Sequence, residues 1–275
     1  GWILLTPIIL FVILMVLLYI PPVQNLLRRE VTAYASKATG MQIQVERIDL
    51  RFPLNLLVRG VEVIQQPDTL LSLESLNVRV QAWPLLKGKV EVDEVTLSQV
   101  AVNSANLIEG MQIKGVLGRF FLQSHGVDLS NETAVVNRTE LSDTHIQLLM
   151  TDTTTTPKDT TASAPVNWKV NLHQLKLKNV SFGMKLPADS MKMAAYIGEA
   201  TIDDAKADLK NQFYGLKQFL LSGASASYDT GEAQPSEGFD ASHMAVRNIR
   251  IGLDSLLYVG RNMNAVIREI TMEER

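Results

Sequence analysis

Apolar and polar residues alternate along most of the chain after residue 41, and the alternation slips by one position at many points. In residues 89–102, KVEVDEVTLSQVAV, Val90 and Val92 keep step, Asp93-Glu94 intervenes, and the apolar alternation then resumes. A strand places residues i and i+2 on one face, whereas on a helix these two residues point well apart. The frequent valine, isoleucine and threonine residues also favour strands. The pattern therefore predicts a mainly β protein.

Each slip inserts one extra polar residue, which returns the following apolar residues to the face they would otherwise leave. A β-bulge or sharp bend has this effect. Two-residue hairpins are the alternative, but the pairs are poor turn formers and would leave strands of only about three residues. We therefore predict long strands that bend and keep one apolar face. The polar pairs are Glu46-Arg47, Arg59-Gly60, Glu74-Ser75, Asp93-Glu94, Ser98-Gln99, His173-Gln174, Lys178-Asn179, Asp203-Asp204, Lys217-Gln218, Ser222-Gly223, Arg247-Asn248, Asp254-Ser255 and Arg268-Glu269.

An uncharged segment, WILLTPIILFVILMVLLYI, opens the chain at residues 2–20. As a helix it would span roughly 28 Å, close to the ~30 Å hydrocarbon thickness of a bilayer. Trp2 and Tyr19 lie at its two ends, where amphipathic rings prefer the interface, and Phe11 lies between them. A cleaved signal peptide would have a shorter apolar region and a small-residue cleavage site, but PPVQNLLRRE follows. We predict a transmembrane anchor at residues 1–20.

A second helix is predicted at residues 21–40, because apolar residues recur there at a spacing of three to four before Gly40. Such a helix could lie in the membrane surface or pack as a lid on the end of the following sheet, and the two interpretations are compatible. Its apolar residues include Val23, Leu26, Leu27, Val31 and Tyr34.

Two segments 80 residues apart share the strand pattern without gaps, which suggests a repeated sheet module. They are KVEVDEVTLSQVAV and KVNLHQLKLKNVSF, residues 169–182. Between them lies TDTTTTPKDTTASAP, residues 151–165, which has too little apolar content to order itself. We expect a first β module at 41–150, a flexible loop at 151–165, and a second module at 166–275 that continues beyond a fragment of a longer protein.

Composition narrows the candidate chemistry. The chain has no cysteine and a net charge of −3 with both signs scattered, which excludes thiolate sites and gives no reason to expect a nucleic-acid partner. Known catalytic motifs are not found in the sequence, and the four histidines have no paired ligand spacing. We therefore expect no catalytic site, no metal, no cofactor and no enzyme activity.

The first 103 residues resemble the start of AsmA-like proteins, particularly the TamB type. The resemblance rests on the anchor, the helix closed by Thr39-Gly40, the strand onset at Leu70-Leu71, and PLLKGK at residues 84–89 before the next strand. The Thr-rich insertion, with Asp-Thr-Thr triplets similar to O-glycosylation sites, resembles members from Bacteroidetes. The resemblance implies a single-pass inner-membrane protein whose long periplasmic antiparallel β-sheet curls into an open apolar trough. Such a trough moves phospholipid between the inner and outer membranes.

The resemblance also implies a distal partner of the Omp85 or TamA barrel type, and an alternative role as a scaffold in outer-membrane protein translocation and assembly. A closed β-sandwich would use the same apolar residues, so the sequence leaves trough and sandwich open. The residues expected to contact acyl chains are Val92, Val95, Leu97, Val100, Val102, Leu172, Leu175, Leu177, Val180 and Phe182.

Overall fold

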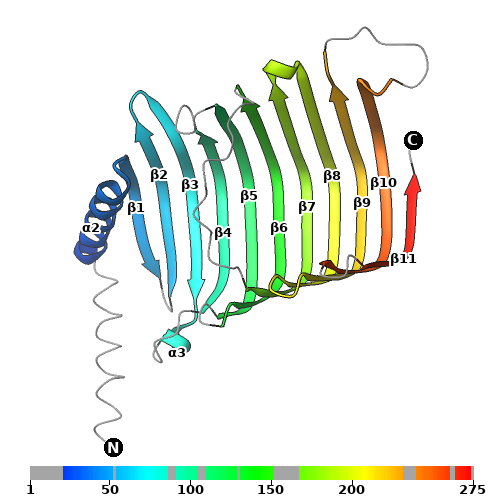
Figure 1. The fold of residues 1–275 in the computed structure, drawn as a ribbon. Coiled ribbons are helices and arrows are strands. Elements are labelled where there is room, and N and C mark those ends of the chain that lie inside the picture. Colours follow the sequence, from blue (N-terminus) through cyan, green and yellow to red (C-terminus); the bar gives the residue numbers. More distant parts are fainter. Residues whose placement is uncertain are drawn as a thin grey trace, which may run out of the picture.

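The computed structural model describes residues 21–51, 54–85, 91–104, 110–128, 131–151, 167–231, 240–260 and 264–273. One helix, α2 (Pro21–Thr39), precedes a long sheet (Figure 1). The short helix α3 (Ala82–Leu85) and the 3-10 turn η1 (Pro187–Asp189) lie between strands. The strands are β1 (Gln42–Arg51), β2 (Asn55–Gln65), β3 (Asp68–Val80), β4 (Val92–Asn103), β5 (Met111–Asp128), β6 (Thr133–Met150), β7 (Lys169–Leu186), β8 (Met191–Asp208), β9 (Phe213–Asp229), β10 (His243–Val259) and β11 (Asn264–Glu273).

The mainly β prediction is confirmed: the sheet has 11 strands, whose order in space is their order in the chain. It stays open, because β1 and β11 form its two edges. The expectation of a wholly antiparallel sheet is wrong at one place, where β6 and β7 pair in parallel. Parallel neighbours need a connection of a dozen or more residues, and the chain between Met150 and Lys169 is long enough to provide one.

Long strands run through the polar pairs, as the phase slips predict. Seven of these pairs carry a left-handed residue at their second position, a conformation that is rare within regular strands. The seven residues are Gly60, Gln99, Asn179, Asp204, Gly223, Asn248 and Ser255. Hairpin turns do not occur at these pairs, and the chain turns instead between β2 and β3 and between β7 and β8.

The phase slips of neighbouring strands fall at one level, which we call the first bend row. In each pairing from β1 to β8, one residue of each strand is unpaired at this level, and the register continues on both sides of it. Between β8 and β9 two residues of each strand are unpaired there. The left-handed residues of the row lie on strands that run in one direction, β2, β4, β6, β7 and β9. The row consists of Glu46, Gly60, Glu74, Gln99, Gly118, Asp143, Asn179, Gly198 and Gly223.

A second bend row crosses the later strands, six positions along β7 from the first. Here the left-handed residues, Asp204 and Ser255, lie on β8 and β10, which run in the opposite direction. Because both rows cross several strands at one level, the sheet bends along lines rather than strand by strand. The second row consists of Asn137, His173, Asp204, Lys217, Ser255 and Arg268.

Helix α2 lies beside β1 and satisfies backbone groups on that edge of the sheet (Figure 1). Ser36 Oγ accepts a hydrogen bond from the Ile43 amide at 3.1 Å, and an Arg28 guanidinium N–H donates to the Glu46 carbonyl at 2.6 Å. Gly40, with φ +70°, ends the helix as predicted. The helix therefore protects one edge from pairing with other strands. At the other edge β11 has no partner beyond it among the described residues.

Candidate functional site: an uncovered apolar face

The ten predicted contact residues share one face of the sheet, which we call the apolar face. On β4, Val95, Leu97 and Val100 pair with Leu122, Phe120 and Leu117 of β5. On β7, Leu175, Leu177 and Val180 pair with Ile202, Ala200 and Ile197 of β8. Side chains in such cross-strand pairs point to the same side of a sheet, so the apolar surface extends from strand to strand.

The alignment of the two sequence segments corresponds to real positions in the sheet. Following the register from β4 through β5 and β6 to β7 places Val95 level with Leu175 and Leu97 level with Leu177. The same path takes Val102 to Phe182. Residues at equivalent places in the repeat therefore lie in common rows that run across the strands.

In the described strands, charged side chains lie on the other face. On either side of the first bend row, the rows of the apolar face hold aliphatic, aromatic, alanine, glycine and threonine residues in the described strands. One such row reads Ile48, Val58, Leu76, Leu97, Phe120, Leu141, Leu177, Ala200 and Leu221. The face is thus a broad uncharged surface that crosses the sheet.

Nothing in the described part of the chain forms a second layer over the apolar face. The main contacts between elements join neighbouring strands, together with α2 and β1. No large side chain of the described residues is less than 2% exposed. Exposure rises toward one margin, where Val102, Ile146 and Phe182 are 38%, 40% and 42% exposed. A sandwich would bury these residues, so over the described residues the sheet is open.

Polar contacts tie the bend rows together on the opposite face. In the second row His173 Nδ1 lies 3.2 Å from Asp204 Oδ1, and Lys217 Nζ lies 3.8 Å from Asp204 Oδ2. The hydrogen bond from His173, assisted by the charge of Lys217, lowers the pKa of Asp204 below its ordinary value of 3.8. These groups are exposed, so the contacts organise the bend and form no enclosed catalytic site.

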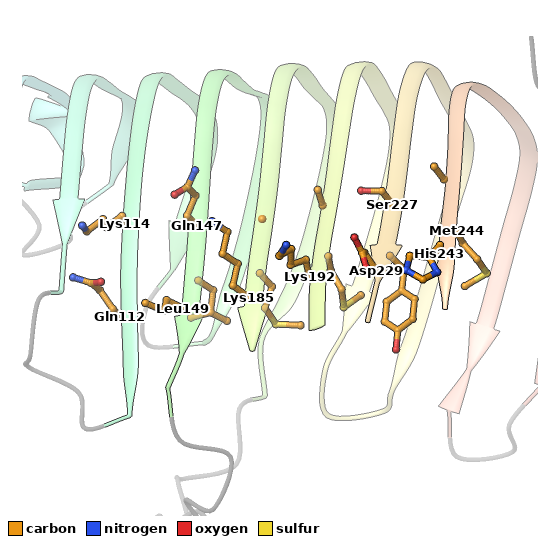
Figure 2. Close-up of a pocket in the computed structure, with 17 residues that line it drawn as sticks. Gln112, Lys114, Gln147, Leu149, Lys185, Lys192, Ser227, Asp229, His243 and Met244 are labelled. Atoms are coloured by element: carbon orange, nitrogen blue, oxygen red, sulfur yellow. Dashed lines mark ion pairs between the residues drawn. The ribbon is translucent and has the colours of Figure 1, made fainter. Parts of the chain in front are cut away.

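A hollow of about 730 Å³ lies at the margin of the sheet, near the ends of β5 to β10 (Figure 2). We call it the lysine hollow, because Lys114, Lys185 and Lys192 line it. Its lining also includes Met184 and Met193, which lie opposite one another on β7 and β8. The sequence pattern did not point to this hollow, since its residues meet only through the strand register.

Sequence reasoning also missed positions of the first bend row, and apolar-face residues, on β5, β6 and β8. Leu117-Gly118-Arg119-Phe120 has the same form as the recognised pairs. On β6 and β8 the residue that follows the polar pair is Thr144 or Ala200, so the apolar alternation around the pair is weaker. Ser142-Asp143 on β6 and Gly198-Glu199 on β8 were therefore not recognised.

The predicted membrane-proximal residues are only partly described. Trp2, Phe11 and Tyr19 of the predicted anchor lie outside the described residues, as do the side chains of Val23, Leu27 and Val31. Leu26 and Tyr34 are 50% and 77% exposed. Among the helices of the described segments, none combines the length and apolar character that a membrane crossing requires.

Comparison of the chain with models of known protein families gives no match. Comparison with curated protein sequences gives no significant match either.

Proposed function

We propose that this protein is an inner-membrane-anchored, periplasmic bridge that carries phospholipid between the inner and outer membranes. In this proposal the acyl chains lie along the apolar face, and the bend rows turn that face toward a shared trough. The observation that carries the proposal is the combination of an uncharged face across the sheet with the lack of a covering layer in the described residues.

The physical chemistry of the face suits transport. Each acyl CH₂ buried against aliphatic side chains contributes roughly 0.8 kcal/mol, and this attraction is non-directional. The attractions of all the CH₂ groups together could therefore hold a lipid firmly, while the lipid slides past rows of similar residues. Rows of equivalent composition, such as the one shared by Leu97 and Leu177, offer successive positions of similar affinity.

Site-specific photo-crosslinking in cells tests this proposal. A photoreactive residue at Leu97 or Leu177 should capture phospholipid, because both lie on the apolar face. Their chain neighbours Thr96 and Lys176 point to the opposite face and serve as matched controls that should capture little or none. Crosslinks from Leu97 and Leu177 to protein alone would contradict lipid carriage.

A second candidate function is a scaffold that pairs with strands of outer-membrane proteins, working with an Omp85 or TamA type barrel. The far edge of β11 favours it, because Val266, Ile267 and Ile270 are 48–55% exposed there. Exposed strand edges accept added strands through backbone hydrogen bonds. In this case a proline at Ile267 should impair assembly, whereas a charge at Leu177 on the apolar face should not.

A further inference from the structure

Helix α2 has two sides with different surroundings. On one side Arg28 and Ser36 form hydrogen bonds with the backbone of β1. Leu26 and Tyr34 each precede one of these residues by two positions, and two positions turn a helix by about 200°. Their side chains are correspondingly exposed, by 50% and 77%. Leu26 and Tyr34 therefore mark a side of α2 that points away from β1, which we call the outer face.

No other described element covers the outer face, since the main contacts of α2 are with β1. Arg29 and Lys37 each follow one of its apolar residues by three positions and so lie beside it. Arg29 pairs with Glu30 of the same helix at 3.4 Å, whereas Lys37 makes no ion pair among the described residues. The outer face thus combines exposed apolar side chains with flanking cations. Surfaces of this kind bind a partner or a membrane.

The chain before α2 favours a membrane as the partner. Residues 2–20 are uncharged and are predicted to form the anchor, and they end directly before Pro21, the first residue of α2. An anchor at these residues leaves the start of α2 at the bilayer surface. Tyrosine is enriched at membrane interfaces, where its ring lies among apolar groups and its hydroxyl reaches water. Lysine and arginine beside it can bury their stems while their charges contact lipid phosphates.

We propose that the outer face of α2 lies in the headgroup region of the membrane that holds the anchor, with Leu26 and Tyr34 directed toward the acyl chains. This proposal rests on the anchored part of the proposed function and adds a second contact with the same bilayer. The contact is weak by itself, because it buries two apolar side chains. The anchor makes it intramolecular, which favours it without any further contact.

Membrane contact of α2 places the start of the apolar face beside the lipid. Because the other side of α2 is bonded to β1, a membrane-bound α2 holds β1 at the bilayer surface. Ile43 and Val45 of β1 belong to rows of the apolar face. A phospholipid that leaves the bilayer there reaches the apolar face without exposing its acyl chains to water.

Spin labelling of the full-length chain in nanodiscs of phosphatidylethanolamine and phosphatidylglycerol tests the contact. The chain has no cysteine, so Ala33→Cys gives a single labelling site at an exposed position of α2 and leaves Leu26 and Tyr34 in place. Oxygen concentrates in the bilayer, whereas a water-soluble Ni(II) complex stays outside, so the ratio of their effects on nitroxide relaxation reports membrane contact. We expect this ratio to be at least about fivefold higher for Ala33→Cys than for Met272→Cys. Met272 is 69% exposed on β11, at the far edge of the sheet.

Adding Leu26→Ser and Tyr34→Ser should lower the ratio at Ala33→Cys to the Met272→Cys value, and both side chains are exposed enough for the fold to tolerate the change. The matched control, Val266→Ser with Ile270→Ser, removes two apolar side chains that are 55% exposed on β11 and should leave the ratio unchanged.

Equal ratios at the two labelled positions, or a ratio that survives the loss of Leu26 and Tyr34, would overturn the membrane contact of α2. Lipid capture at Leu97 and Leu177 is measured separately, so lipid carriage would still stand. A chain that does not enter nanodiscs at all would overturn the anchored part of the proposed function as well.

Discussion

Asn179 donates a hydrogen bond from Nδ2 to Oδ1 of Asp143 at 2.7 Å, and both residues have left-handed backbones, with φ of 53° and 52°. They lie at the same level of β6 and β7, the parallel pair of the sheet. The bond therefore links the β6 and β7 residues of the first bend row. These two strands precede and follow the long connection and lie side by side. Asparagine and aspartate tolerate the left-handed region better than other non-glycine residues, so they suit this position.

Replacing Asn179 with valine should destabilise the sheet by about 2 kcal/mol. A β-branched residue is disfavoured in the left-handed region, and the bond to Asp143 is lost as well. Urea unfolding of the purified chain would measure the change. Asn179→Gly, which loses the bond and relieves the backbone, should cost less. Asn171→Val, at an exposed position on the same strand, should be close to neutral. Equal effects at Asn171 and Asn179 would contradict this role of the bend row.

Gly118 should tolerate no larger residue. A Cβ at this position would lie 2.7 Å from the Cβ of Asp143 and 3.0 Å from its carbonyl oxygen, and the backbone atom cannot easily move away. We expect Gly118→Ala to destabilise the chain by about 1–3 kcal/mol. Gly183→Ala is the control, since its Cβ would meet nothing closer than 3.9 Å. Thermal unfolding of both variants checks the difference, and a stable Gly118→Ala protein would show that β5 and β6 lie farther apart here.

A single charge on the apolar face should reduce lipid carriage without unfolding the sheet. Leu177→Glu places a carboxylate where acyl chains would pass, and an unpaired charge is costly in an apolar environment. Because Leu177 is not fully buried, the carboxylate can still reach water in the lipid-free protein. We expect co-purified phospholipid to fall at least about fivefold, a change of roughly 1 kcal/mol. Lys176→Glu, one residue away on the other face, should bind lipid as the wild type does.

The hydrogen bond from His173 should be visible in the titration of Asp204. Because the folded pKa of Asp204 is lowered, its contribution to stability is present above the ordinary value of 3.8 and is lost as pH falls through the lowered value. His173→Ala should raise the pKa of Asp204, which carboxyl ¹³C titration by NMR would measure. His145→Ala removes a histidine whose Nδ1 lies 2.6 Å from Ser181 Oγ, and it should leave Asp204 unchanged.

Helix α2 should shield the backbone of β1 from solvent exchange. Removing both polar contacts with Arg28→Ala and Ser36→Ala should increase amide hydrogen exchange at Ile43 by about tenfold. Arg29→Ala is the control, because the Arg29 side chain is 75% exposed and its polar partner is Glu30 of the same helix. Unchanged exchange at Ile43 in the double variant would show that the rest of α2 protects this edge.

Local pattern determined the strands and their bends. Alternation between two faces depends only on neighbouring residues, so the strand character of residues 92–103 and 169–186 could be predicted. The breaks in alternation at Ser98-Gln99 and Lys178-Asn179 could be predicted too, and Gln99 and Asn179 are left-handed there. The end of α2 at Gly40 was equally local, because a left-handed glycine stops a helix through its own backbone. The membrane anchor stays a prediction, since residues 1–20 lie outside the described part of the chain.

Only the tertiary structure decided what lies beside each strand. The parallel pairing of β6 with β7 depends on where a long connection returns the chain, which no local pattern specifies. The sheet is open because no segment of the described residues packs on its apolar face. The lysine hollow could not be predicted for the same reason. Lys185 and Lys192, which line it, oppose one another because of the β7–β8 register, and the hollow is formed by six neighbouring strands. Sequence sets each residue's face, whereas pairing between strands sets its neighbours.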